Sequence, residues 1–409
     1  MDEKTRYLIV GAGLAGASAA QAIRERDPEG RLILVGQEPN PPYDRPPLSK
    51  QYLLSDEWTV ERAYSKDPSF YSERNVELYQ GVKVTAIDRA ERAVRLGDGA
   101  TIRYEKLLLA TGARPRRLNL PGSDLDGLFY LRRAEDADAI RAALRRGRRA
   151  VMVGAGYIGM EVAAACAQRG LEVTVIERAD RPWATFASTA LGNFLRRYYE
   201  DRGVRFIFGE EVASFEGDGR LAAVTTRQGS RVEADFAVLG IGAILNTELA
   251  REAGLDVDER HGVQVDAFLQ TSDPNIWAAG DIACFEDLAL GKKWHVEHYM
   301  NAEWQGAAAG AIMAGENKPF NKVAYFFSDI FDIHMCLRGD PEARGGSVVL
   351  GDIEAAEFVE LYHDESGQVR MGVAISHDAS RPDTIGNIVQ SLIRERANVA
   401  ALDAATFGL

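Results

Sequence analysis

Glycines at fixed short spacings form two turns whose residue types suit the binding of a nucleotide pyrophosphate. In the first, Gly11, Gly13 and Gly16 follow the apolar run Tyr7–Val10 and open an alanine-rich stretch. The first glycine permits a tight turn, the second lets a pyrophosphate approach the backbone, and the third lets a helix pack on the strand. The free N–H groups at the helix N-terminus would bind the phosphates.

An acid stands where a ribose hydroxyl would need an acceptor. A second apolar strand is predicted at Leu32–Val35, and Glu38 follows it, 27 positions after Gly11. Such an acid accepts hydrogen bonds from the ribose of a bound dinucleotide. This sequence of strand, glycine turn, helix, strand and acid predicts a dinucleotide site rather than a glycine loop without a ligand.

The same constellation occurs a second time. Gly154, Gly156 and Gly159 follow the apolar strand Ala150–Val153, and Glu177 lies 23 positions after Gly154. Two dinucleotide sites in one chain are explained most simply by one nucleotide cofactor that transfers electrons to another. Both copies require parallel strands with crossover helices, so we predict an α/β fold with two Rossmann-like domains.

The second acid bears on cofactor choice. Glu177 would accept a hydrogen bond from an unmodified ribose and repel a 2′-phosphate, which favours NAD over NADP. Arg178 and Arg181 lie close enough in the sequence to leave NADP open as the alternative.

Prolines dominate the segment after the first acid. They predict an extended loop over residues 39–50 that excludes helix and holds Arg45 and Lys50 in place, with Ser49 as a candidate cap for the helix that follows. The alternative is a proline-rich connector with solvated charges.

Two further strands end in glycine. Thr111-Gly112 follows one, and Gly280-Asp281 follows the other, where Asp281 could reach a polyol hydroxyl at the carboxyl edge of a parallel sheet. His295 and His298 precede a helix predicted over 302–314, but no third ligand of matching spacing is present, so we predict no metal site.

The C-terminal part has a different pattern. Strands predicted at 347–350, 356–363 and 369–376 and an amphipathic helix at 384–400 indicate a small α+β domain.

Bulk composition excludes several classes. A net charge of −13 argues against nucleic acid as a partner, and no apolar run is long enough to span a membrane. Cys166, Cys284 and Cys336 are widely spaced, which argues against disulfides, zinc and a redox-active dithiol. The polar N-terminus does not read as a signal peptide, so we expect a cytoplasmic protein.

With these motifs assembled, the chain resembles the NADH-dependent ferredoxin reductases that serve ring-hydroxylating dioxygenases and cytochrome monooxygenases. The stretch Tyr43–Lys50, which reads YDRPPLSK, carries the resemblance most specifically, together with Gly240–Ala243 and both glycine turns. The family is related to apoptosis-inducing factor and monodehydroascorbate reductase. The resemblance covers nearly the whole chain and implies the glutathione-reductase architecture.

The resemblance also implies four segments and a set of site residues. An FAD domain would comprise 1–117 and 247–325, an inserted NAD domain 118–246, and a C-terminal α+β domain 326–409. The FAD residues would be Gly11, Gly13, Gly16, Glu38, Arg45, Lys50, Val82 (or Val84), Thr111, Gly112, Arg114, Gly280 and Asp281, with Val296, Glu297 and His298 near the flavin edge. The NADH residues would be Gly154, Gly156, Gly159, Glu177 and Gly242. Glu161 would pair with Lys50 and so fix a cation near flavin N5, making these two the expected catalytic residues.

The acceptor implied by the resemblance is a ferredoxin, but two departures keep alternatives open. Phe327 stands where the family usually has tryptophan, and Val296–His298 resembles the apoptosis-inducing factor and monodehydroascorbate reductase pattern. The alternatives are direct reduction of a quinone, an ascorbyl radical or oxygen, and an NADH-responsive redox protein. A dock for an acidic carrier, or else a solvated face, would be formed by nine arginines: Arg114, Arg116, Arg117, Arg132, Arg133, Arg145, Arg146, Arg148 and Arg149.

Overall fold

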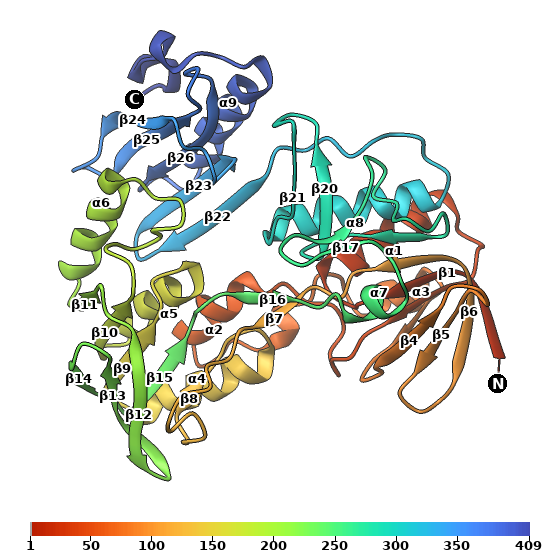
Figure 1. The fold of residues 1–409 in the computed structure, drawn as a ribbon, viewed down its shortest axis with the longest axis horizontal. Helices are drawn as coiled ribbons and strands as arrows, with labels where there is room; N and C mark the ends of the chain where they lie inside the picture. The colour runs from red at the N-terminus through yellow and green to blue at the C-terminus, as the bar shows by residue number, and fades with distance from the viewer. Residues whose placement is uncertain (1) are drawn as a thin grey trace. The chain divides into compact units, whose positions relative to one another are not determined.

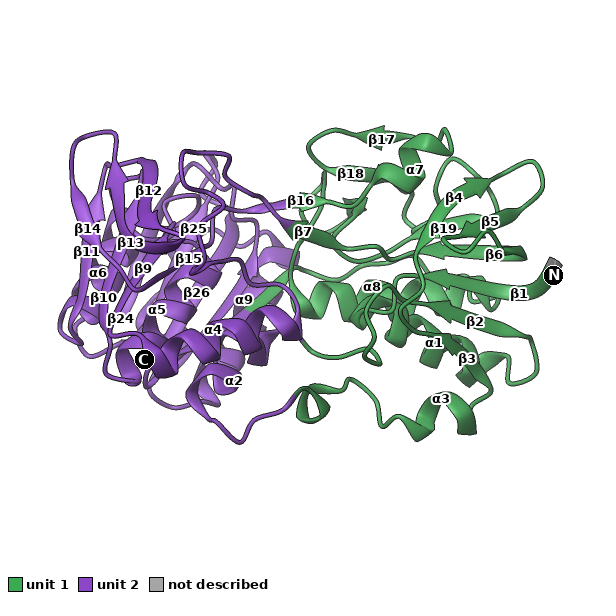
Figure 2. Cartoon of the chain, turned by 90° about the horizontal axis from the view of Figure 1, so that it is seen from below, with its two compact units in different colours: residues 1–44, 60–114, 244–326 green, residues 45–59, 115–243, 327–409 purple. Residues whose placement is uncertain are grey.

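The chain folds into two compact units in the computed structural model, which describes residues 2–409 (Figure 2). The first unit contains residues 2–44, 60–114 and 244–326, and the second contains residues 45–59, 115–243 and 327–409. Each unit is therefore assembled from segments that are far apart in the sequence. No helix in the described chain has both the length and the apolar character that crossing a bilayer requires.

A seven-stranded sheet forms the centre of the first unit, with the order β3–β2–β1–β6–β5–β4 and with β19 also paired to β6. Figure 1 labels β1, β4, β5 and β6 of this sheet, and Figure 2 labels the other strands as well. The strands are β1 (Asp2–Val10), β2 (Leu32–Val35), β3 (Val76–Tyr79), β4 (Val84–Asp88), β5 (Ala93–Leu96), β6 (Thr101–Leu109) and β19 (Ile276–Ala278). The β3, β2, β1, β6 and β19 strands are parallel, and β1 ends level with its neighbours because Val10 pairs with Val35 and with Leu109. Ligands bind outside this edge in open α/β sheets.

Two helices with small residues pack closely in this unit. They are α1 (Leu14–Arg26) and α8 (Tyr299–Met313). A Cβ atom on Gly306 would lie 2.1 Å from the carbonyl oxygen of Ala15, and one on Gly310 would lie 2.3 Å from that of Ala19. The glycines therefore allow a backbone approach that any other residue would prevent.

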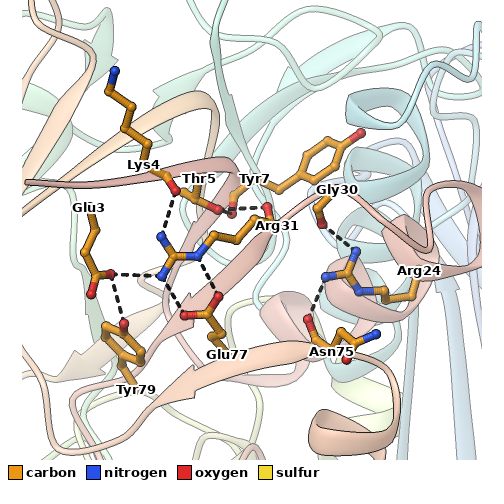
Figure 3. Close-up of polar contacts among 10 residues, drawn as sticks. All are labelled: Glu3, Lys4, Thr5, Tyr7, Arg24, Gly30, Arg31, Asn75, Glu77 and Tyr79. Atoms are coloured by element: carbon orange, nitrogen blue, oxygen red, sulfur yellow. Dashed lines mark hydrogen bonds and ion pairs between the residues drawn. The ribbon is translucent and has the colours of Figure 1, made fainter.

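At the opposite edge, Arg31 ties together the beginnings of three parallel strands (Figure 3). Its Nε and Nη2 donate to the Glu77 carboxylate at 2.6 and 2.8 Å, and its Nη1 donates to the Lys4 carbonyl at 2.8 Å. Glu3 accepts from Arg31 and from the Tyr79 hydroxyl. This bidentate pair fixes the register of β1, β2 and β3 away from the glycine turn.

Arg24 performs a similar task from within α1. Its side chain is buried, and its guanidinium donates to the backbone carbonyls of Asp27, Gly30 and Asn75 at 2.7 to 2.9 Å. Figure 3 shows the contacts with Gly30 and Asn75. The helix is thereby joined to the start of β2 and to the residue preceding β3. The remaining elements of the first unit are η2 (Val60–Ala63), α3 (Ser69–Glu73), α7 (Glu248–Glu252), β17 (Val257–Asp258), β18 (Gly262–Gln264), β20 (Ala283–Asp287) and β21 (Lys292–Trp294).

The second unit contains a five-stranded parallel sheet in the order β11–β10–β9–β15–β8. Its strands are β8 (Leu128–Phe129), β9 (Arg149–Val153), β10 (Glu172–Glu177), β11 (Val204–Phe208) and β15 (Phe236–Leu239). Its helices are α4 (Ala134–Arg146), α5 (Tyr157–Gln168) and α6 (Thr189–Glu200), beside η1 (Pro46–Ser49) and α2 (Gln51–Leu54). An antiparallel sheet of β12 (Val212–Asp218), β13 (Arg220–Thr226) and β14 (Arg231–Glu233) accompanies it, and β7 (Ala113–Pro115) and β16 (Ala243–Leu245) lie where the chain passes between units.

The C-terminal residues form a five-stranded sheet in the order β22–β23–β26–β25–β24, with α9 packed on β26 and β23. The elements are β22 (Tyr325–Ile330), β23 (Ile333–Gly339), β24 (Gly346–Asp352), β25 (Glu357–His363), β26 (Val369–Ser376), α9 (Arg381–Glu395), η3 (Val399–Ala401) and η4 (Ala404–Phe407). The predicted α/β class is confirmed.

Local predictions differ from the structure in four places. The helix predicted at 384–400 ends earlier, since α9 stops at Glu395 and Arg396 after it has the left-handed φ of +53°. The proline segment is not wholly extended: Pro46–Ser49 forms a 3₁₀ turn, which the prolines permit because they stand in its first turn, where their missing N–H groups would have no partner. Ser49 caps no helix, since Lys50 occupies the N-cap of α2 and no side chain caps it. In the C-terminal sheet, β22 and β23 were not predicted.

Candidate functional site

The first glycine turn has the geometry of a pyrophosphate cradle. Gly11 has φ +119°, and a Cβ atom there would lie 2.1 Å from the carbonyl oxygen of Ala110. A Cβ atom on Gly16 would lie 2.1 Å from the Gly11 oxygen, so turn and helix are in backbone contact. Gly13 faces open space within 4 Å and begins α1 without any side-chain cap. Backbone donors at an uncapped helix N-terminus beside an open space suit a phosphate.

Three other expected FAD residues surround this edge in the same unit. Glu38 accepts a hydrogen bond from the Tyr43 hydroxyl. The Val82 backbone N–H donates to the Gly36 carbonyl at 2.8 Å, so residue 82 lies beside the end of β2. Gly112 has φ +64° and lies three residues after Leu109, the last residue of β6.

Thr111 and Arg114 are both tied to the segment that follows β16. The Thr111 hydroxyl donates to the carbonyl of Asn246 at 2.6 Å, and the Arg114 guanidinium donates to the Asn246 side chain and to Glu248. Arg114 is exposed and engaged by these partners, so its expected role as an FAD-binding residue remains a prediction.

Gly280 and Asp281 follow the last parallel strand, β19. The Gly280 N–H donates to Oε1 of Gln305 at 2.9 Å, while Asp281 is buried. The Nε2 group of Gln305 is fully buried and has no hydrogen-bond acceptor among the described residues. A buried donor of this kind beside the glycine edge fits a polar cofactor such as FAD.

The N-terminus of α8 brings the flavin-edge candidates to the same unit. His298 is the N-cap of α8 and makes no side-chain cap bond, Val296 is buried, and Glu297 accepts from His295. Desolvation lowers the pKa of His298 to about 4, an effect that the Glu297 charge partly opposes. Among the described residues no group of three potential metal ligands is found.

The second glycine turn repeats the first in the second unit. Gly154 has φ +98°, and a Cβ atom on Gly159 would lie 2.0 Å from the Gly154 oxygen. Gly156 begins α5 without a side-chain cap. A Cβ atom on Gly156 would lie 3.9 Å from its nearest neighbour, the carbonyl oxygen of Gly240. Gly242 has φ +100° and faces open space. These residues fit a second dinucleotide.

Glu177 is held against this turn. Its Oε2 accepts the N–H of Ala155 at 2.7 Å and its Oε1 accepts the N–H of Ala179 at 2.8 Å. The acid therefore stands at the turn in a fixed orientation, as a ribose-binding residue should.

Lys50 and Glu161 form the ion pair that the resemblance implied. The distance from Nζ to Oε1 is 2.6 Å, and both side chains are at least nine-tenths buried. Glu161 is therefore not a solvated helix acid. Two residues that sequence reasoning did not place in the site also contact it: the hydroxyls of Ser49 and Ser328 donate to its two oxygens.

The units divide the expected FAD residues. Arg45 and Lys50 belong to the second unit, where Arg45 donates to the Arg132 carbonyl, and the others belong to the first. The three cysteines are free and buried, and burial raises the pKa of the Cys166 thiol to about 12, which disfavours its thiolate.

Several of the arginines considered as a dock already have acidic partners. Arg145 pairs with Asp56, and Arg149 pairs with Glu233 and Asp235. Because these acids neutralise Arg145 and Arg149, the two arginines do not add to a continuous basic surface.

Comparison with known proteins decides the family. Residues 5–306 match the pyridine nucleotide-disulphide oxidoreductase family. The chain belongs to this family. The protein is therefore an oxidoreductase, and its family implies FAD and NAD(H) as cofactors.

Individual relatives of this oxidoreductase cover almost its whole length. It is 40% identical over 371 residues to the probable ferredoxin reductase CtmF of Castellaniella defragrans, covering 90% of each chain. It is 38% identical over 373 residues to the ferredoxin--NAD(+) reductase component of the anthranilate 1,2-dioxygenase system of Burkholderia cepacia, again covering 90% of each. A crystal structure of the covalent putidaredoxin reductase–putidaredoxin complex matches with a TM-score of 0.91 and 32% identity, over 100% of this chain and 96% of that one. The predicted resemblance to ferredoxin reductases is confirmed.

Proposed function

We propose that the protein transfers a hydride from NADH to bound FAD and passes single electrons to a ferredoxin. The observation that carries the proposal is the presence of two glycine turns in one chain, each with an open second glycine, Gly13 and Gly156, at an uncapped helix. Relatives named as ferredoxin reductases support it, as they match over 90% of the chain.

The residues present fit both cofactors. FAD would be held by the first turn, by Glu38 at the adenosine ribose and by Asp281 at the ribityl chain. NADH would be held by the second turn, by Glu177 and by Gly242. When bound, FAD accepts an electron pair as hydride and releases the electrons singly, so the protein needs no nucleophile of its own.

Lys50 supplies a positive charge whose position is fixed by Glu161. A buried ammonium that is ion-paired keeps one orientation, and such preorganised charge requires no rearrangement during a reaction. The N-terminus of α8, which starts after His298, would add its partial positive charge at the edge of a bound flavin. Both features favour an electron-rich flavin ring.

NADH is the preferred nicotinamide cofactor in this proposal. Glu177 is oriented by two backbone N–H groups and would repel a 2′-phosphate. Arg181, which could otherwise attract that phosphate, donates to Asp180 at 2.7 Å and to the carbonyl of Ala187 at 3.0 Å. Its guanidinium is thereby engaged within its own segment.

A carrier-dependence assay tests the function. Purified protein loaded with FAD is mixed with NADH and cytochrome c, with and without a bacterial ferredoxin, and absorbance of reduced cytochrome is followed. We expect rapid reduction only when ferredoxin is present, and NADPH should support a much slower rate. A rate that is equally fast without ferredoxin would overturn the ferredoxin assignment.

Phe327 and the Val296–His298 segment favour a second candidate, direct reduction of a small molecule. A steady-state screen with quinones and ascorbyl radical separates the two functions. A long-wavelength absorbance band that persists for minutes in air after NADH addition would instead indicate a redox-responsive protein. We also propose the four-segment domain division and a cytoplasmic location, which the three free cysteines support.

A further inference from the structure

Three buried side chains of the second unit, Ser49, Lys50 and Ser328, contact the buried carboxylate of Glu161. Ser49 ends η1 and Lys50 follows it, Glu161 lies in α5, and Ser328 lies in β22. Their exposed fractions are 1%, 9%, 5% and 0% in that order. The contacts join residues 112 and 167 positions apart. Burial of the Lys50–Glu161 ion pair costs desolvation free energy, which additional hydrogen bonds to the pair offset.

Both oxygens of the Glu161 carboxylate are engaged, and they are engaged differently. Oε1 receives the Lys50 ammonium at 2.6 Å and the Ser328 hydroxyl at 2.6 Å. Oε2 receives the Ser49 hydroxyl at 2.5 Å. A carboxylate only accepts, so both hydroxyl hydrogens point toward it.

The Ser49 hydroxyl has one competing acceptor. The Pro46 carbonyl is 3.4 Å away, which is too long to compete with the carboxylate. Ser49 therefore holds the oxygen that does not touch Lys50 and fixes the rotation of the carboxylate. Ser328 shares the oxygen that Lys50 binds and withdraws part of its negative charge.

We propose that Ser49 and Ser328 are positioning residues for hydride transfer, which set the orientation of the Glu161 carboxylate and thereby the positive charge that Lys50 presents. The inference rests on the proposed function, because it takes Lys50 to lie near the flavin. Neither serine needs to touch a cofactor for this role. Hydrogen bonds to charged groups are among the stronger ones in proteins, so losing one should be measurable.

The chain offers a matched control in Ser376. Ser376 is also 0% exposed, lies in β26 of the sheet that contains β22, and donates to a carboxylate, Glu357, at 2.9 Å. Ser328→Ala and Ser376→Ala thus each delete one buried hydroxyl-to-carboxylate bond, and Ser376→Ala also removes the oxygen that accepts the Asp378 N–H at 2.9 Å. Only the first deletion touches the Lys50–Glu161 pair.

The test measures the midpoint potential of bound flavin and the single-turnover rate of flavin reduction by NADH. In Ser328→Ala and Ser49→Ala the carboxylate charge is less compensated, so we expect a more negative potential and a rate about 10-fold to 100-fold lower, as for one lost bond to a charged group. Ser328→Thr should restore both values toward wild type, and Ser328→Val, of the same shape without the hydroxyl, should not. Ser376→Ala should leave potential and rate at the wild-type values.

The outcomes separate this inference from the proposed function. If Ser328→Ala changes thermal stability as Ser376→Ala does while its potential and rate equal those of wild type, the serines are structural and the inference fails. If wild-type protein binds no flavin, or NADH does not reduce it, the proposed function itself fails. A Ser328→Val variant that matches Ser328→Thr would also overturn the inference.

Discussion

The Glu177 carboxylate accepts the backbone N–H of Ala155, which lies inside the second glycine turn, at 2.7 Å. The acid at the end of β10 and the turn at the end of β9 are therefore one structural unit. A residue that binds the turn through one oxygen and Ala179 through the other has little freedom to move away from a bound nucleotide.

Replacing Glu177 with Ala should weaken discrimination between the two nicotinamide cofactors. Loss of the negative charge removes the repulsion of a 2′-phosphate. The ratio of kcat/KM for NADH to that for NADPH should therefore fall by a factor of about ten or more, and a tenfold fall corresponds to a free-energy difference of ~1.4 kcal/mol. Glu172→Ala, at the exposed start of the same strand, is the control and should keep the wild-type ratio. An unchanged ratio in Glu177→Ala would refute the assignment.

The two open glycines give a prediction that separates the two nucleotide sites. Neither Gly13 nor Gly156 has a positive φ or a close neighbour, so alanine should be tolerated by the fold at both positions. Gly13→Ala should nevertheless lose most of its flavin because the methyl group occupies the pyrophosphate approach. Gly156→Ala should retain flavin but show a raised KM for NADH. Flavin absorbance per protein and steady-state kinetics measure the two effects, and equal flavin content in both variants would contradict the assignment.

The turns could be predicted from sequence because their determinants are local. Gly11 and Gly16 are required by backbone contacts within six residues or with the neighbouring strand end, and the apolar runs that become β1 and β2 are continuous. The Ser49–Glu161–Ser328 contacts could not be predicted, since they join distant positions and serine carries no periodic signal. The strands β22 and β23 were not predicted because residues 325–339 include aromatic, charged and thiol side chains without a clear alternation of apolar and polar residues.

Arg24 should contribute much more to stability than its exposed neighbour. Arg24→Met leaves three part-buried carbonyls without their donor, so the free energy of unfolding should fall by about 2–4 kcal/mol. Arg26, two residues further along α1, pairs with Glu316 at the surface, and Arg26→Met should cost less than about 1 kcal/mol. Urea unfolding of both variants measures the difference; equal losses would show that the three carbonyls find other donors, such as water.

His298 should make the stability of the protein depend on pH in a defined window. Desolvation lowers its pKa in the folded chain from 6.5 to about 4, so between these values the unfolded chain binds a proton that the folded chain does not. The contribution of His298 to the free energy of unfolding is therefore fully present above pH 6.5. It is lost as the pH falls toward 4, and the loss amounts to up to about 3 kcal/mol. His298→Gln should flatten this part of the profile relative to wild type.

The neighbouring acid provides the check on the cause. The Glu297 charge raises the His298 pKa and so opposes desolvation, and Glu297→Gln should extend the loss of stability to lower pH. Urea midpoints of the flavin-loaded protein at several pH values between about 7 and 4 measure the slopes. If wild type and His298→Gln gave parallel profiles, the ring would not be desolvated in solution. In that case the N-terminus of α8 would be open to water, and its partial positive charge would be too well screened to act on a flavin ring.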